Sequence, residues 1–78
     1  MPSTEISQTI DARGLSCPMP IVKTAQAVRT VASGAFIELL ATDPGSTRDV
    51  AAWCRATGHE LLEQSVEGPT FRFVIRRK

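Results

Sequence analysis

The spacing of hydrophobic and polar residues divides the chain into strand-like and helix-like segments. In residues 6–11 (ISQTID), Ile6 and Ile10 lie on one side and polar residues on the other, which predicts a short, half-buried strand. From Pro18 to Ala32 the apolar positions follow helical spacing, and Ser33–Gly34 is a suitable end for a helix. The stripe consists of Ile21, Ala25, Val28 and Ala32. Residues 35–41 (AFIELLA) are almost continuously apolar and predict an interior strand.

The second half of the chain repeats this alternation. Asp43-Pro44-Gly45 is typical of a turn, after which we expect Ser46 or Thr47 to cap a second helix that ends at Gly58. Its inward stripe is Val50, Trp53, Cys54 and Thr57, and its outward residues are Arg48, Asp49 and Arg55. Residues 59–67 and 70–77 read as two strands joined by a turn at Gly68-Pro69.

The resulting order, βαβαββ, predicts the fold class. We expect an α/β (α+β) two-layer sandwich, with two helices packed on one face of a four-stranded mixed sheet. The other face of the sheet should be polar and solvated. A length of 78 residues predicts a single domain spanning residues 1–78, with residues 1–5 loosely held.

Composition narrows the classes of function. Nine basic and eight acidic residues give a formal net charge of +1, which argues against a dedicated nucleic-acid binder. No apolar run approaches the roughly 20 residues that span a bilayer, and the first residues lack the features of a signal peptide. We therefore expect a cytoplasmic protein without membrane attachment, and we find no set of metal ligands.

The chain has two cysteines, Cys17 and Cys54, and in a reducing compartment free thiols are the better expectation for both. Cys54 shares its helical spacing with Val50 and Trp53, so we interpret it first as a core residue. A second sulfur site or a disulfide partner is the alternative for Cys54.

Cys17 lies at the start of the first predicted helix, in the stretch SCPMP. We place Cys17 at the N-cap and Pro18 at the first helical position, so that Pro18 and Pro20 fall within the turn that tolerates proline. Met19 is then the main N–H donor available to the sulfur. This contact and the helix dipole predict a modestly lowered thiol pKa, which the apolar neighbours Leu15 and Met19 oppose.

The chemistry around Cys17 favours a carrier. No cysteine follows at CxxC spacing, and the single histidine, His59, is far away in sequence, so a hydrolytic Cys–His pair is poorly supported. A pre-aimed thiol without a catalytic base suits a sulfur that accepts a group and is then attacked by a partner.

The stretch DARGLSCPMPIVK resembles the signature of the TusA/SirA family of sulfur carrier proteins, in which Cys-Pro-x-Pro opens the first helix. The resemblance continues at TDPGSTRD, GHEL and FRFVIRR and covers nearly the whole chain. It implies the βαβαββ fold already expected. It also implies that Cys17 is the sulfur-bearing residue, with the surrounding motif as support: Arg13, Gly14, Pro18, Met19 and Pro20.

The resemblance further implies that Cys17 accepts a sulfane sulfur as a persulfide from a cysteine desulfurase or a rhodanese. The sulfur would then pass to a cysteine of a Tus-type or DsrE-like acceptor, toward 2-thiouridine in tRNA or toward oxidative sulfur metabolism. No cofactor and no metal are implied, and the chain would be a sulfurtransferase-type carrier that does not turn over alone. We expect a monomer that forms transient complexes.

Basic residues offer a possible docking surface for such partners. The candidates are Arg13, Lys23, Arg72, Arg76 and Arg77, and plain solvated charge is the alternative for each. Two other functions stay open: a redox or regulatory thiol protein in which Cys17 and Cys54 form a reversible disulfide, and a small RNA-binding module. The near-neutral charge weakens the RNA-binding reading.

Overall fold

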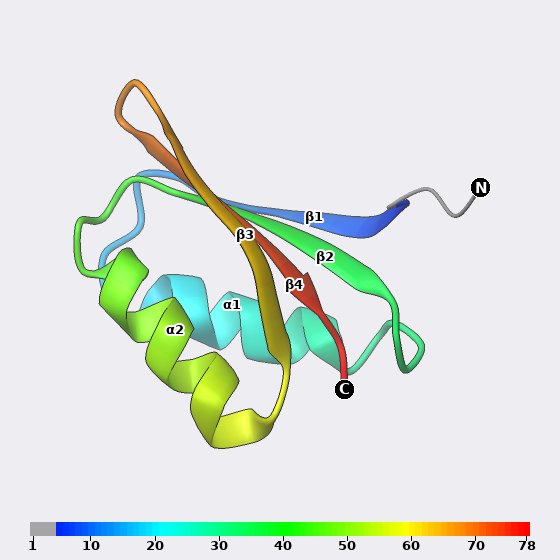
Figure 1. Cartoon of the computed structure of the whole chain (residues 1–78). Coiled ribbons are helices and arrows are strands. Elements are labelled where there is room, and N and C mark those ends of the chain that lie inside the picture. The colour runs from blue at the N-terminus through cyan, green and yellow to red at the C-terminus, as the bar shows by residue number, and fades with distance from the viewer. Residues whose placement is uncertain (1–4) are drawn as a thin grey trace.

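A computed structural model describes residues 5–78 of the chain (Figure 1). The four strands are β1 (Ile6–Ala12), β2 (Phe36–Ala41), β3 (Glu60–Glu67) and β4 (Thr70–Arg76), and the two helices are α1 (Met19–Val28) and α2 (Ser46–Thr57). The predicted order βαβαββ is confirmed. The expectation of a loose segment at residues 1–5 falls outside the described residues except for Glu5, which is exposed.

The strands form one mixed sheet in the order β1-β2-β4-β3. β1 and β2 are parallel, as expected for strands joined through a helix, whereas β4 pairs antiparallel with both β2 and β3. The tight turn at Gly68 connects β3 to β4. The two central strands, β2 and β4, therefore have hydrogen-bonded neighbours on both sides.

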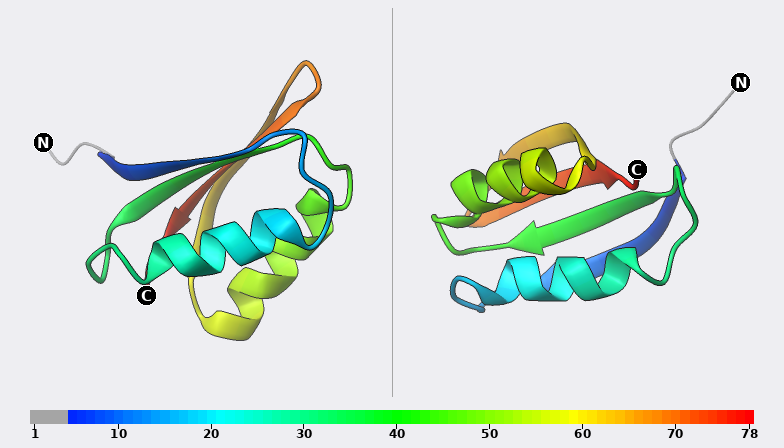
Figure 2. Two further views of the ribbon diagram at one scale, coloured as in Figure 1. Left: turned by 180° about the vertical axis from the view of Figure 1, so that it is seen from behind. Right: turned by 90° about the horizontal axis from the view of Figure 1, so that it is seen from below.

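Both helices cover one face of this sheet, which gives the predicted two layers (Figure 2). Because side chains alternate along a strand, every second residue of β1, β2 and β4 points toward the helices. Phe73, Ile37 and Leu39 are fully buried there. The rest of the core cluster is Ile10, Ala12, Ala27, Val28, Ala41, Val50, Cys54 and Ile75.

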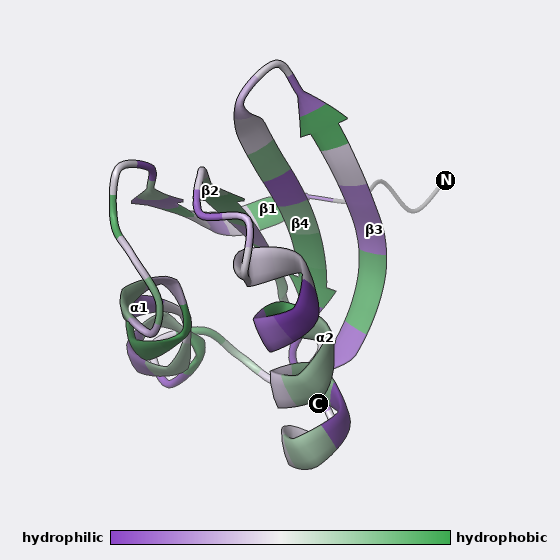
Figure 3. Ribbon diagram, turned by 90° about the vertical axis from the view of Figure 1, so that its left-hand side faces the viewer, coloured by the Kyte–Doolittle hydropathy of each residue, from purple (hydrophilic) through white to green (hydrophobic). Residues whose placement is uncertain are grey.

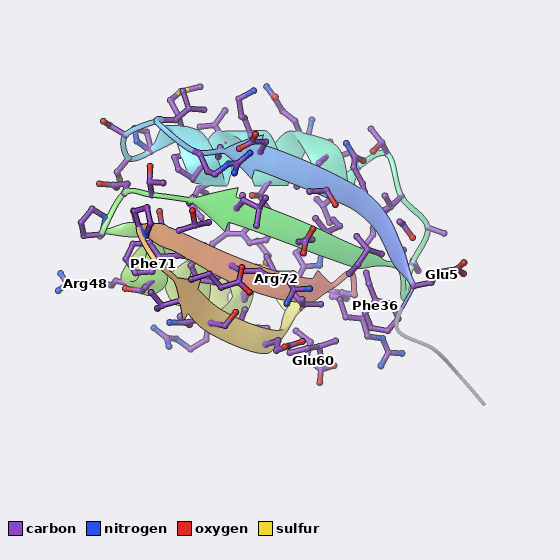
Figure 4. All side chains as sticks on the ribbon, turned by 90° about the horizontal axis from the view of Figure 1, so that it is seen from above. Glu5, Phe36, Arg48, Glu60, Phe71 and Arg72 are labelled. Carbon is purple, nitrogen blue, oxygen red and sulfur yellow. The ribbon has the colours of Figure 1, made fainter. Side chains whose placement is uncertain are left out.

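The opposite face of the sheet carries polar side chains, as predicted, but it is not entirely polar. Arg72 on β4 projects from this face (Figure 4) and forms ion pairs with Glu38 on β2 and Glu63 on β3. The Thr9 hydroxyl donates to Glu38 Oε1 at 3.0 Å. Val74, on the same face as Arg72, is only 2% exposed, so the expectation of a fully solvated face is wrong at this position.

Helix α1 is shorter than the predicted Pro18–Ala32. It ends at Val28, where the Arg29 and Thr30 N–H groups close the last turn by donating to the Gln26 and Ala27 carbonyls at 3.3 and 2.9 Å, the tighter spacing common at helix ends. Its buried face also differs from the predicted stripe and consists of Pro20, Thr24, Ala27 and Val28. The stripe was misplaced because Thr24, a polar residue, is buried with its hydroxyl bonded to the Pro20 carbonyl at 2.8 Å.

Helix α2 ends as predicted, with Gly58 in the left-handed conformation (φ +86°) that glycine adopts at little cost. The predicted side-chain cap at its start is wrong. Gly45 is the N-cap residue and no side chain caps the helix. Ser46 is already inside the helix with its Oγ buried, and the Thr47 hydroxyl donates to the Pro44 carbonyl at 3.3 Å.

Three connections gather at one end of the sheet. β1 and β2 are parallel and both lead into a helix there, and the start of β4 lies beside the end of β2 because Phe71 pairs with Ala41. Figure 4 shows Arg48 and Phe71 at this end and Phe36 and Glu60 at the other. Figure 3 views the molecule from this end. Among residues 5–78, no helix is long and apolar enough to cross a membrane.

Candidate functional site

The exposed cysteine, Cys17, lies in the loop between β1 and α1. The prediction that Cys17 caps the helix is wrong. Helix α1 begins one residue later than expected, with Pro18 as the N-cap residue and no side-chain cap. The Met19 N–H, expected to contact the sulfur, instead donates to the Ser16 carbonyl at 2.9 Å.

The prolines of the motif do fall where a helix tolerates them. Pro20 occupies the first turn of α1, where its missing N–H breaks no helical hydrogen bond. The Pro18 carbonyl accepts from Ile21 and Val22, each at 3.1 Å, and so starts the helical ladder. Pro20 is also buried, so it anchors this end of α1 in the molecule, whereas Met19, two positions after Cys17, is 42% exposed.

The loop that carries Cys17 is fastened to the loop between β2 and α2. The Gly14 N–H donates to Thr42 Oγ1 at 2.9 Å, and the Cys17 N–H donates to Asp43 Oδ2 at 3.2 Å. Gly14 has φ +82°, a conformation that favours glycine. These contacts fix the backbone on both sides of the turn that presents the thiol.

The sulfur itself contacts a carboxylate. Cys17 Sγ donates to Asp49 Oδ2 at 2.8 Å, from the first turn of α2. Both residues line a surface cavity of about 390 Å³. The other lining residues are Pro44, Gly45, Thr47 and Arg48. The thiol therefore sits between the starts of two helices, next to the carboxylates of Asp49 and Asp43.

The electrostatics of this site reverse the predicted direction. The hydrogen bond to Asp49 raises the pKa of the Cys17 thiol above its ordinary value, and loss of solvation and the negative charges of Asp49 and Asp43 act in the same direction. The expected lowering of this pKa is therefore wrong, because carboxylates rather than backbone donors face the sulfur. At neutral pH the resting group is the protonated thiol, the less nucleophilic form.

The five basic residues considered for docking do not form one surface around Cys17. Arg13 makes two hydrogen bonds to Asp11, each at 2.8 Å, and holds the pKa of Asp11 at about 2. Lys23 is exposed on α1, and Arg72 is engaged on the open face of the sheet. Arg76 and Arg77 lie at the end of the sheet away from the thiol, where Arg76 pairs with Phe36.

The second cysteine is not part of this site. Cys54 is 4% exposed and belongs to the core cluster, which confirms its interpretation as a core residue. Burial raises the pKa of its thiol. His59 packs against Trp53 with ring centroids 5.0 Å apart, and its Nδ1 accepts from the Lys78 N–H. In residues 5–78, no group of three or more potential ligands is placed to hold a metal ion.

The sequence analysis did not identify three residues that contact the Cys17 loop: Thr42, Asp43 and Asp49. Asp49 was assigned to the outer face of α2, and Asp43 to the turn alone. The available signal was topological, because consecutive parallel strands place their carboxyl-terminal loops at the same edge of a sheet. That rule brings residues 42–49 close to Cys17 across 26 to 32 positions of sequence.

Comparison with known proteins identifies the family. The model of the family described as sulfurtransferase TusA matches residues 8–77. The chain belongs to the TusA family. This confirms the resemblance drawn from the Cys-Pro-Met-Pro motif. The matched residues include Cys17.

Curated relatives of this TusA-family chain match most of its length. The putative sulfur carrier protein YrkI of Bacillus subtilis is 46% identical over 70 residues, which cover 90% of this chain and 93% of the relative. The sulfur carrier protein TusA of Allochromatium vinosum is 40% identical over 94% of this chain and 96% of its own length. A third relative, the putative sulfur carrier protein YrkF of Bacillus subtilis, is 47% identical over 87% of this chain but only 37% of its own length.

A solved structure supports the fold. The crystal structure of a SirA-like protein from Desulfitobacterium hafniense superposes with a TM-score of 0.79 over 88% of this chain and 95% of that chain, at 21% sequence identity. The predicted α+β sandwich is therefore confirmed both by the structure of this TusA-family chain and by a fold neighbour.

Proposed function

We propose that this protein is a sulfur carrier that binds a sulfane sulfur as a persulfide on Cys17 and relays it to an acceptor protein. The observation that carries the proposal is the exposed Cys17 of a Cys-Pro-Met-Pro motif, in a chain of the TusA family. Relatives named sulfur carrier proteins match it over most of their length.

The geometry of Cys17 suits transfer between proteins. The thiol is exposed at the end of the sheet where the loops gather, and hydrogen bonds from Gly14 and Cys17 to the neighbouring loop hold its backbone in place. The other cysteine is buried in the core, so no second thiol in the described residues offers itself to resolve a persulfide on Cys17. A sulfur bound there would therefore remain until a partner removes it.

A sulfur carrier needs one protein that donates the sulfur and another that accepts it. The donor is a cysteine desulfurase or a rhodanese, and the acceptor is a Tus-type or DsrE-like protein with a cysteine of its own. The sulfur then enters 2-thiouridine in tRNA or oxidative sulfur metabolism. We propose a monomer in the cytoplasm, consisting of one carrier domain, that forms transient complexes with these proteins and does not bind nucleic acid directly.

Three of the residues proposed to support Cys17 hold the backbone around it in place. Gly14 anchors the loop, Pro18 starts the helical ladder, and buried Pro20 fixes the end of α1. Met19 offers an exposed apolar side chain two positions after Cys17. Of the five basic residues, Lys23 on α1 is the best candidate for docking, because the described contacts of the other four already engage a carboxylate or a carbonyl.

The proposal is tested by loading the purified protein. Incubation with a cysteine desulfurase and cysteine, or with a rhodanese and thiosulfate, should add the mass of one sulfur atom, and dithiothreitol should remove it. The gain should disappear in Cys17→Ser and persist in the matched control Cys54→Ala. A gain that survives in Cys17→Ser, or no gain with either donor, would contradict the proposal.

The same experiment separates the alternative of a reversible disulfide. Mild oxidation would then remove two hydrogen atoms from the mass, which requires the two sulfurs to meet with Cα atoms within about 7 Å. The burial of Cys54 in the core disfavours this reading. Salt-sensitive binding to RNA would instead favour the RNA-binding module.

A further inference from the structure

The contact between Cys17 and Asp49 depends on one proton. Cys17 Sγ lies 2.8 Å from Asp49 Oδ2 and acts as the donor. The carboxylate is half-buried in the first turn of α2. Asp43, whose Oδ2 accepts from the Cys17 N–H, adds a second negative charge near the sulfur, and Arg48 lines the same cavity. The bond therefore joins the loop before α1 to helix α2 through the reactive sulfur itself.

A thiol that bears its proton is attracted to a carboxylate, whereas the same sulfur without a proton is not. A thiolate would place two negative charges within hydrogen-bond distance, which disfavours the thiolate. In a persulfide, Sγ is bonded to carbon and to the outer sulfur and carries no hydrogen. The outer sulfur is acidic, and its negative charge is repelled by Asp49 and Asp43.

We propose that Asp49 is a positioning residue that distinguishes the empty carrier from the loaded one: it holds Cys17 against α2 as a thiol and releases it once the outer sulfur is attached. This inference rests on the proposed carrier function. In the empty state the sulfur is tied to the protein and protected from unproductive reactions. In the loaded state the persulfide is free to turn toward the acceptor.

Loading transfers the outer sulfur atom from a persulfide of the donor to Cys17. Cys17 Sγ attacks the outer sulfur of the donor's cysteine persulfide, the S–S bond of the donor breaks, and the donor cysteine leaves with the bonding electrons. The proton that leaves Cys17 is balanced by the proton that the departing donor sulfur takes up. One S–S bond is exchanged for another, so no oxidant or reductant is required.

The first test measures the thiol without any sulfur donor. The rate of alkylation of Cys17 by iodoacetamide, followed as a function of pH on the peptide that contains Cys17, gives its thiol pKa. Asp49→Asn should shift this pKa downward and raise the rate at neutral pH several-fold, whereas Asp49→Glu should restore much of the wild-type profile. Glu60→Gln, at the far end of the sheet, is the matched control. A profile unchanged by Asp49→Asn overturns the proposal and leaves the carrier function untouched.

The second test compares the two states of the sulfur. Methyl methanethiosulfonate converts Cys17 into a methyl disulfide and releases methanesulfinate. The methyl disulfide is a stable substitute for the persulfide, because its Sγ also carries no hydrogen. Asp49→Asn should lower the urea midpoint of unfolding more in the thiol form than in the methyl disulfide form, because only the thiol form has a hydrogen bond to lose. An equal shift in both forms would assign Asp49 a purely structural role and overturn the proposal.

Discussion

The sulfur of Cys17 has an acidic neighbourhood, although it lies next to the start of a helix. Proximity to a helix N-terminus alone would favour the thiolate. In this protein Asp49 accepts a hydrogen bond from the sulfur itself, and Asp43 binds the backbone N–H of the same residue. A direct bond at 2.8 Å outweighs the partial charge of the helix end, so the thiol form is stabilised.

A second carboxylate, Glu38, predicts how stability depends on pH. The hydrogen bond from Arg72 holds the pKa of Glu38 below its ordinary value of 4.5, and the Thr9 hydroxyl acts in the same direction. Because this pKa is lower in the folded state than in the unfolded state, the stabilisation is present in full above pH 4.5 and is lost as the pH falls further. Urea unfolding should therefore show a fall in the free energy of unfolding on acidification through this window.

The substitution Glu38→Gln should remove this part of the pH dependence and cost about 1 kcal/mol at neutral pH, since both side chains are largely shielded from solvent. Glu60→Gln is the matched control, because its ion pair with Arg76 spans 3.9 Å between well-exposed groups. Equal pH profiles for Glu38→Gln and the wild type would show that the pair contributes nothing.

At the scale of elements, the site depends on the contact between two loops. The loops that follow β1 and β2 meet because these strands are parallel neighbours, and Thr42 and Asp43 accept backbone hydrogen bonds from Gly14 and Cys17. The position of the thiol is therefore set by the sheet and by α2 as much as by its own helix.

Removal of one of these bonds should loosen the loop. Thr42→Val keeps the shape of the side chain but removes the oxygen that accepts from the Gly14 N–H, which should cost about 1 kcal/mol in the free energy of unfolding. Amide exchange at Gly14 should also become faster. Thr70→Val, which makes the same chemical change on β4, serves as the control. Unchanged exchange at Gly14 in Thr42→Val would show that the bond does not hold the loop.

The sequence alone was sufficient to predict the elements of the fold and the family to which the chain belongs. Alternation and helical spacing are local properties, so they predicted all six elements and their order, and the motif pointed to Cys17. The direction of the thiol pKa was wrong because Asp49 approaches from 32 positions away, and hydropathy placed it on the outer face of its helix. The end of α1 was also missed, because the apolar pattern continues to Ala32 whereas the helix ends at Val28.

At the scale of the whole molecule, the sheet order separates the strands into two classes. β2 and β4 are flanked by hydrogen-bonded neighbours, whereas β1 and β3 form the edges. Most of β3 is exposed, and the fully buried residues Ile37, Leu39 and Phe73 belong to the central pair. The stability of the fold is therefore concentrated in β2 and β4.

Native-state amide exchange should follow this order. The slowest amides should lie in β2 and β4 and exchange only through global unfolding, while those of β3 should exchange earlier by local opening. Measurement by NMR in deuterated water gives each strand its own free energy of opening. Slowest exchange in β3 or β1 would contradict this distribution of stability.

The strand register also determines where this molecule can be joined to others. Ile6 at the beginning of β1 and Arg76 at the end of β4 both pair with Phe36, so β1 begins and β4 ends at the end of the sheet remote from Cys17 (Figure 1). A tag, a surface attachment or an additional protein module can be fused at either end and leave the sulfur open to its partners. The same geometry allows this fold to serve as one part of a longer polypeptide, as its match to a fraction of YrkF illustrates.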